Sequence, residues 1–184
     1  MCTSHCPTGV SRRDFTRLAV AGGLGLLPWR AWAAQEVTAP LADTLAIMCI
    51  DYRLVDPTMR TLDRITSGSK KFDLVAMAGA SLAGTHTTEF PAEYDGLWEQ
   101  VRIATTVHPL VKKVIVVDHR ECGAYEAVYG PLTGDEEKKK HLWVMGKVKR
   151  ELSLRHLESQ FWLMSKAGND WTAEELFPAL LTYA

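Results

Sequence analysis

The stretch KKVIVVDHRECG, residues 112–123, joins a run of apolar residues to side chains capable of chemistry. The four residues 114–117 are all β-branched and apolar, which is typical of a strand buried on both faces, as in a parallel sheet. His119 and Cys122 follow where this strand is expected to end. A cysteine is often a small core residue and a lone histidine is often structural, so the rest of the sequence must explain this pair.

Two earlier segments have the same apolar character. TLAIMCI (44–50) and FDLVAMAGAS (72–81) are expected to form further buried strands, and helices are expected between them at 57–68 and 91–110. Alternating strands and helices predict an α/β fold of three layers, with a central, mostly parallel β-sheet flanked by helices.

The C-terminal part has a different pattern. Residues 135–168 have apolar residues at helical spacing, with acidic residues first and basic residues later, and are expected to form one long helix. The charged run 135–140 is interpreted as the solvated start of this helix. Residues 172–181 are expected to form a short final helix, interrupted near Pro178, and no fourth buried strand is evident.

The first 33 residues have the features of a twin-arginine signal peptide. Arg12 and Arg13 precede a short apolar run, and Ala-Trp-Ala (31–33) matches a cleavage site. The run is too short to span a bilayer. We therefore expect passage through the twin-arginine export machinery, cleavage after Ala33, a periplasmic location and one mature domain at 34–184. An amphipathic N-terminal helix or an uncleaved anchor is the alternative.

Composition limits the classes of partner and of cysteine chemistry. The chain has 184 residues, 47% of them hydrophobic, and a formal net charge of −1, so nothing indicates a nucleic-acid partner. Two of the four cysteines, Cys2 and Cys6, would leave with the signal peptide. The remaining two, Cys49 and Cys122, either form one disulfide in an oxidising compartment or are protected by a metal.

The ends of the first and third predicted strands carry a candidate metal site. Cys49 lies at the end of the first, and His119 and Cys122 follow the third. Because parallel strands end at the same edge of a sheet, these side chains can converge. Two thiolates and one imidazole suit a tetrahedral Zn²⁺ with one open position, at which a water is acidified. Asp51 and Arg53 are alternate residues beside this edge and form a candidate orienting pair.

The pattern C-x-D-x-R followed by H-x-x-C-G resembles the β-class carbonic anhydrases, over Thr44 to Gly130. The resemblance implies a β-carbonic-anhydrase-like fold with Cys49, His119 and Cys122 as zinc ligands, and Asp51 and Arg53 as a catalytic pair. It implies a carbonate dehydratase-like zinc lyase, which hydrates CO₂ reversibly to bicarbonate by attack of zinc-bound hydroxide. It also implies a homodimer or higher homo-oligomer with active sites at subunit interfaces.

Two departures from the family pattern keep other functions open. The family has Arg-Asn-Ala-Gly where this chain has Ala-Met-Ala-Gly (76–79), and glycine where it has Asp118. One alternative is a zinc hydrolase of a related small molecule, carbonyl sulfide or carbon disulfide. Another is a zinc-binding domain without catalysis, in which Asp51 closes the open metal position.

Other interpretations of single residues remain. A Cys49–Cys122 disulfide and a cysteine–histidine nucleophile are the rivals of the metal site. Asp51 and Arg53 could form a mere surface pair. His86 is expected in a solvated loop, from which it could also reach the pocket. The remaining histidines of the predicted domain, His108, His141 and His156, are expected to be structural or exposed.

Overall fold

The computed structural model describes residues 42–69 and 71–178, and the predicted signal peptide lies outside these ranges. The sheet consists of β1 (Thr44–Cys49), β2 (Phe72–Met77), β3 (Lys113–His119), β4 (Glu158–Ala167) and β5 (Asp170–Leu176), in the order β2-β1-β3-β4-β5. The first four strands are parallel, and β5 runs antiparallel to β4. The prediction of a central, mostly parallel sheet is confirmed.

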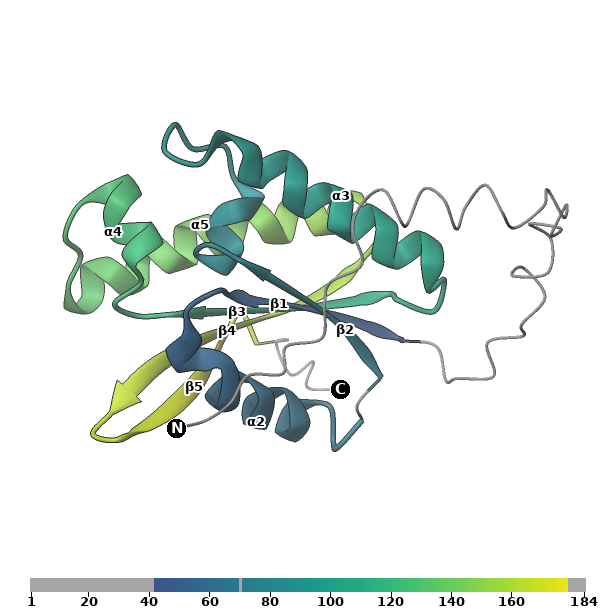
Figure 1. Cartoon of the computed structure of the whole chain (residues 1–184), viewed down its shortest axis with the longest axis horizontal. Helices are drawn as coiled ribbons and strands as arrows, with labels where there is room; N and C mark the ends of the chain where they lie inside the picture. Colours follow the sequence, from purple (N-terminus) through teal and green to yellow (C-terminus); the bar gives the residue numbers. More distant parts are fainter. Residues whose placement is uncertain (1–41, 70, 179–184) are drawn as a thin grey trace, which may run out of the picture. The chain divides into compact units, whose positions relative to one another are not determined.

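Helices cover both faces of the sheet (Figure 1). They are α2 (Val55–Ile65), α3 (Pro91–Val107), α4 (Gly123–Tyr129) and α5 (Gly134–Leu154), with short 3₁₀ helices at Tyr52–Leu54 and Ala80–Gly84. Figure 1 shows α2 on one side of the sheet and α3 and α5 on the other, which gives the three predicted layers. None of the helices in the described ranges combines the length and the apolar character needed to cross a bilayer.

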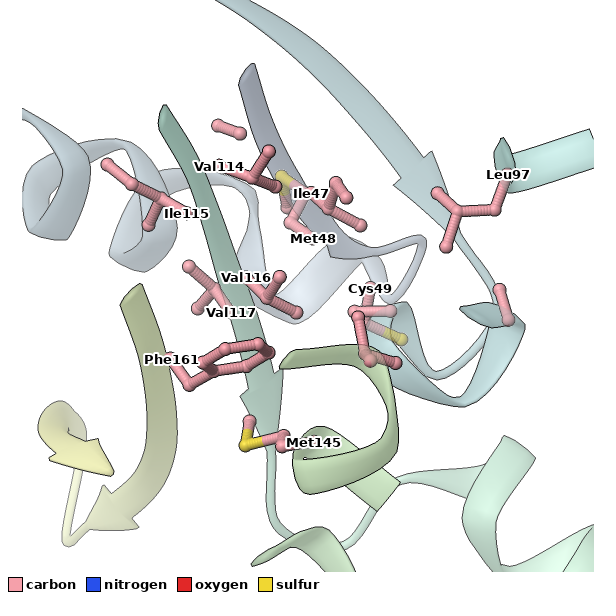
Figure 2. Packing of buried hydrophobic residues seen from close by; sticks show 14 of the residues in the cluster. Ile47, Met48, Cys49, Leu97, Val114, Ile115, Val116, Val117, Met145 and Phe161 are labelled. Carbon is pink, nitrogen blue, oxygen red and sulfur yellow. The ribbon is translucent and has the colours of Figure 1, made fainter. Parts of the chain in front are cut away.

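The core lies around the two central strands. All six residues of β1 are buried, and so are residues 114–119 of β3. Figure 2 shows their side chains packed with Phe161 of β4 and Met145 of α5. The continuous apolar runs at 44–50 and 114–117 therefore mark strands with both faces covered, as their sequences predict.

β2 is shorter and more exposed than predicted. It ends at Met77, and the chain continues into the 3₁₀ helix Ala80–Gly84. β2 lies at an edge of the sheet, and the side chain of Leu74 is 46% exposed. Its apolar composition indicates a strand, but the sequence does not reveal that β2 pairs on one side only among the described residues.

The single helix predicted over 135–168 is wrong. α5 ends at Leu154, His156 adopts a left-handed φ of 57°, and β4 begins at Glu158. The apolar residues Phe161 and Met164 continue the helical spacing of α5, which explains the error. In the structure β4 pairs with β3, so the fourth strand that the sequence did not reveal is present.

The short helix predicted at 172–181 is also wrong over the described residues 172–178, and 179–181 lie outside the described part of the chain. Residues 170–176 form β5, which is joined to β4 by a tight turn containing Gly168 with a φ of 62°. Exposed and half-buried residues alternate along β5, as expected for a strand with one solvated face. Pairing with β4 therefore decides the conformation of a segment whose composition also suits a helix.

Candidate metal centre

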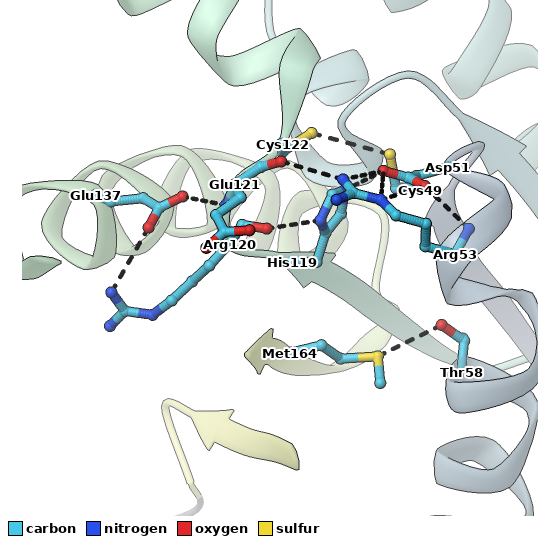
Figure 3. A network of polar contacts seen from close by, with 10 residues as sticks. All are labelled: Cys49, Asp51, Arg53, Thr58, His119, Arg120, Glu121, Cys122, Glu137 and Met164. Atoms are coloured by element: carbon cyan, nitrogen blue, oxygen red, sulfur yellow. Dashed lines mark hydrogen bonds and ion pairs between the residues drawn. The ribbon is translucent and has the colours of Figure 1, made fainter. Parts of the chain in front are cut away.

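Three buried side chains converge at the carboxyl edge of the sheet (Figure 3). Cys49 is the last residue of β1, His119 is the last residue of β3, and Cys122 caps the start of α4. Their candidate ligand atoms all lie within 4.8 Å of one another, and the two sulfurs are 3.9 Å apart. The convergence predicted from the sequence is present in the structure.

Sheet register explains this convergence. β1 and β3 are parallel neighbours, with Met48 opposite Val117, so the two strands end side by side. The chain then turns at Arg120, whose backbone N–H donates to the carbonyl of Met164 in β4. This turn brings Cys122 back toward Cys49, although the two are 73 residues apart in sequence.

His119 is oriented as a metal ligand would be. Its Nδ1 lies 2.8 Å from the backbone carbonyl of Arg120, and because a carbonyl can only accept, Nδ1 carries the proton. Its Nε2 is buried and has no hydrogen-bond partner among the described residues. The lone pair of Nε2 is thus available for a metal, and the Arg120 carbonyl supplies the outer contact that fixes the ring.

The contact between the two cysteines favours one thiolate and one thiol. The hydrogen bond with Cys122 outweighs burial and, together with His119, lowers the pKa of Cys49 to about 4. The same contact and burial raise the pKa of Cys122. Burial opposes a charged imidazole, but the hydrogen bond and charge of Cys49 outweigh it and raise the pKa of His119. The site therefore favours a thiolate even without a metal.

The sulfurs are not bonded to each other. Neither cysteine forms a disulfide, and their 3.9 Å separation far exceeds the length of a disulfide bond, which is about 2.05 Å. Sulfur and imidazole donors in this number suit Zn²⁺ better than Mg²⁺ or Ca²⁺, which prefer oxygen. These residues fit a zinc ion with three protein ligands.

Asp51 and Arg53 form an ion pair beside these side chains. Arg53 Nε donates to both carboxylate oxygens of Asp51 at 3.0 Å, and its Nη2 lies 2.5 Å from Oδ2. The guanidinium holds the pKa of Asp51 below its usual range. Asp51 Oδ2 lies 3.9 Å from Nε2 of His119, so this ionised carboxylate faces the candidate metal position.

A small cavity of about 320 Å³ adjoins the three side chains. Besides them and Asp51, its wall is largely apolar and includes Ile50, Ala78, Gly79 and Phe90. His86 does not line this cavity, and it stacks on Tyr94 with ring centroids 3.6 Å apart. Its exposed position confirms the expectation of a solvated loop histidine.

Sequence reasoning missed a buried polar network next to the site. Asp118 is 1% exposed and accepts hydrogen bonds from Ser81, Tyr125 and His141. Glu137 is also buried, so the run 135–140, interpreted as the solvated start of a helix, does begin helix α5 but is not solvated at this residue. The spacing of Glu137 and His141 by four residues, in phase with the apolar face of α5, is the signal that could have revealed their burial.

The fold and site together define an α/β domain with a buried Cys₂His group that could hold a metal at the carboxyl edge of a parallel sheet. No family model matches the sequence. Two uncharacterized proteins are similar to it, one from Rickettsia bellii (30% identical over 112 residues) and one from Rickettsia conorii (31% over 111). Each match covers 59% of this chain, but only 66% and 58% of the relatives, less than two thirds of either.

Three solved structures are similar at low scores. A tetrameric β-carbonic anhydrase of Sordaria macrospora matches with a TM-score of 0.40 and 12% identity, over 89% of this chain and 97% of that one. The β-carbonic anhydrase CafA of Aspergillus fumigatus matches with a TM-score of 0.40 and 15% identity, over 89% of this chain and 86% of that one. The β-carbonic anhydrase CcaA matches with a TM-score of 0.39 and 15% identity, over 90% of this chain and 98% of that one.

Proposed function

We propose that this chain is a zinc-dependent, β-carbonic-anhydrase-like lyase that hydrates CO₂ reversibly to bicarbonate. The observation that carries the proposal is the buried group of Cys49, His119 and Cys122, with the carboxylate of Asp51 3.9 Å from His119. The C-x-D-x-R and H-x-x-C-G motifs support the same assignment, since they place these residue types in the order of that family.

The residues of the site would have distinct roles in metal binding and catalysis. Cys49, Cys122 and His119 would hold the metal, and a bound Zn²⁺ would acidify a coordinated water and so provide a nucleophile near neutral pH. Asp51 would accept a hydrogen bond from the reacting water and orient it. Arg53 would keep Asp51 ionised and fixed, because its guanidinium contacts both carboxylate oxygens.

The cavity suits a small substrate without charge. CO₂ is linear and has no net dipole, so an apolar wall of Ile50, Ala78 and Phe90 admits it without stripping it of strong hydrogen bonds. The reacting end of the cavity is polar, since Asp51 and His119 lie there. This division would let CO₂ rest against the apolar wall with its carbon facing the polar end, where the attacking water would be oriented.

CO₂ hydration measured by stopped flow on zinc-loaded protein tests the proposal. We expect activity in the wild type and in His156→Asn, an exposed histidine change that tolerates the left-handed backbone. Cys122→Ala should lose both zinc and activity. Equal hydration rates for the wild type and Cys122→Ala would refute the proposed function.

A second candidate keeps the site and changes the substrate to carbonyl sulfide or carbon disulfide. Ala76-Met77, in place of the family's Arg-Asn, motivates it, and the apolar cavity wall suits these linear, weakly polar molecules as well as CO₂. Released sulfide would distinguish this activity from CO₂ hydration. Absence of both activities, with a cobalt spectrum showing Asp51 as a permanent fourth ligand, would instead support a non-catalytic zinc domain.

We further propose that the chain is exported to the periplasm by the twin-arginine machinery and assembles as a homo-oligomer. The export proposal is supported by Arg12-Arg13 and by the apolar run and the Ala-Trp-Ala site that follow them. Replacing both arginines by lysine should retain the protein in the cytoplasmic fraction. N-terminal sequencing of the exported wild type should begin after Ala33.

A further inference from the structure

The loop between His119 and Cys122 needs support from its surroundings. Glu121, in the middle of this loop, adopts a left-handed backbone with a φ of 56°, a conformation that is unfavourable for a residue with a side chain. Both residues flanking this short segment are candidate metal ligands. A relaxation of Glu121 would therefore move Cys122 relative to His119.

Glu137 holds this loop from helix α5. Its side chain is buried, and its Oε1 accepts the backbone N–H of Glu121 at 2.5 Å. Its Oε2 lies 3.6 Å from Nη1 of Arg120, and that same nitrogen donates to the carbonyl of Gly134 at 2.7 Å. Figure 3 shows the Glu137 carboxylate between the loop backbone and the Arg120 guanidinium.

His141 holds the residue before the loop. It lies one helical turn after Glu137, and its Nδ1 donates to Oδ2 of Asp118 at 2.9 Å. Ser81 donates its backbone N–H to Oδ1 of the same carboxylate at 2.9 Å, and the Tyr125 hydroxyl donates to Oδ2 at 2.8 Å. Asp118 thereby joins the end of β3 to three other elements.

The placement of these groups in α5 is not explained by packing alone. The buried face of α5 carries Glu137 and His141 in line with Met145, Val148 and Leu152. A buried carboxylate costs free energy unless it is fully paired, and an apolar residue would fill the same space without that cost. Each polar group of this face bonds to the segment Asp118–Cys122, which identifies that segment as what they serve.

We infer that Glu137 and His141 are positioning residues, which fix the segment Asp118–Cys122 from helix α5 so that His119 and Cys122 meet Cys49 at metal-binding distance. This inference rests on the proposed metal site. Neither residue belongs to the Cys49, His119 and Cys122 group, so both act on metal affinity and coordination geometry through the loop.

The test compares Glu137→Leu with Glu136→Leu, a matched change at the adjacent exposed position. Zinc affinity is measured by competition with a chromophoric chelator, and coordination geometry by the absorption spectrum of the Co²⁺-substituted protein. Glu137→Leu should bind zinc about 10–100-fold more weakly and shift the cobalt spectrum, as for loss of an outer contact of a metal ligand. Glu136→Leu should match the wild type.

Two further variants separate positioning from general stability. Glu137→Gln keeps an oxygen that can accept the Glu121 N–H, so it should restore most of the affinity lost in Glu137→Leu. His141→Phe keeps a ring but removes the donor to Asp118, so it should also weaken zinc binding. If Glu137→Leu does not fold, His141→Phe decides, and an affinity equal to that of the wild type overturns the inference.

The outcomes distinguish this inference from the proposed function. A wild type that binds no zinc through Cys49, His119 and Cys122 would overturn both. A wild type that binds zinc, with Glu137→Leu and Glu136→Leu equal in affinity and spectrum, would overturn only the positioning role. Zinc binding that depends on Glu137 without any CO₂ hydration would overturn the function and support the positioning role.

Discussion

At the scale of single residues, the site combines a fixed imidazole with an ionised carboxylate. His119 has its Nδ1 proton committed to the Arg120 carbonyl, which leaves Nε2 facing Cys49, Cys122 and Asp51. Arg53 contacts both oxygens of Asp51, so the direction of that carboxylate is set by a bidentate pair. These contacts make Asp51 the residue whose change should separate metal binding from catalysis.

Asp51→Asn should lower the rate of CO₂ hydration by about 10–100-fold while zinc content stays near that of the wild type. The amide is uncharged and presents one acceptor, so it orients a reacting water less well and no longer pairs with Arg53. Stopped-flow rates and metal analysis of the same preparation check this. A variant that loses zinc together with activity would instead assign Asp51 to metal binding.

Zinc binding should release protons and strengthen as the pH rises. Cys49 has its pKa lowered to about 4 and is already a thiolate at neutral pH, whereas the raised pKa of Cys122 keeps its proton there. The raised pKa of His119 makes its Nε2 proton a further competitor of the metal, most strongly at low pH. Zinc uptake near pH 7 should therefore release about one proton or more.

Calorimetry in two buffers of different ionisation enthalpy measures this release. The zinc affinity of the wild type should also fall as the pH is lowered, because the metal competes with the protons on Cys122 and His119. Zinc binding without proton release, or with an affinity independent of pH, would contradict the assignment of these groups as ligands.

At the scale of elements, helix α5 and the 3₁₀ helix Ala80–Gly84 are packed without space between them. A Cβ added to Gly84 would lie 2.7 Å from Cγ2 of Val148, closer than real Cβ contacts allow. A Cβ added to Gly146, on α5 itself, would meet nothing within 4 Å. Gly84 therefore leaves no room for the methyl group of alanine, whereas Gly146 does.

Gly84→Ala should lower the free energy of unfolding by about 1–3 kcal/mol, because the core around Val148 must shift. Gly146→Ala should raise it by about 0.5–1 kcal/mol, because alanine favours the helix and reduces the freedom of the unfolded chain. Urea unfolding of both variants checks the sign and size of each change. A destabilising Gly146→Ala would show that α5 is more tightly packed there than the structure indicates.

At the scale of the whole molecule, the candidate metal joins segments far apart in the chain. Cys49 ends β1 and Cys122 caps the start of α4, 73 residues later, so a shared ion would cross-link β1 to the segment that follows β3. A ligand that binds only the folded state stabilises it by mass action. The folded state of the zinc-loaded protein should therefore resist heat better than the metal-free form.

Removal of zinc by a chelator should lower the melting temperature. With free zinc at 100 times its dissociation constant, the stabilisation is about 2.7 kcal/mol. For a domain of this size that corresponds to roughly 5–11 °C. Differential scanning calorimetry of the wild type measures the shift, and His119→Ala should show almost none. Equal shifts in both proteins would point to zinc bound elsewhere.

Self-association is expected through the edge of the sheet formed by β2. In the described part of the chain, the outer edge of β2 pairs with no strand, and Leu74, Ile103 and Val107 are exposed apolar residues near it. Such an edge favours pairing with a second copy of the chain. Light scattering should give at least twice the monomer mass, and Leu74→Lys should reduce it. A wild-type monomer would contradict the expected homo-oligomer.

The sequence alone determined the central strands, because the runs at 44–50 and 114–117 are apolar without interruption and suit only positions covered on both faces. It also indicated that Cys49, His119 and Cys122 would meet, since parallel strands end at one edge. Local pattern could not determine β4 and β5, because apolar residues such as Phe161 and Met164 fit both a helix and a strand. Only pairing with β3, and of β5 with β4, decided between them.

The same limit applies to the support of the site. Glu137 belongs to a charged run, so only its spacing from the apolar face of α5 indicates burial, and Asp118 follows an apolar run at the end of a strand. Tertiary structure placed Glu137 against the backbone N–H of Glu121, and it brought Ser81, Tyr125 and His141 to donate hydrogen bonds to Asp118. The side-chain chemistry of a residue decides whether it can serve as a ligand. The contacts that hold it in place depend on which distant segments pack together.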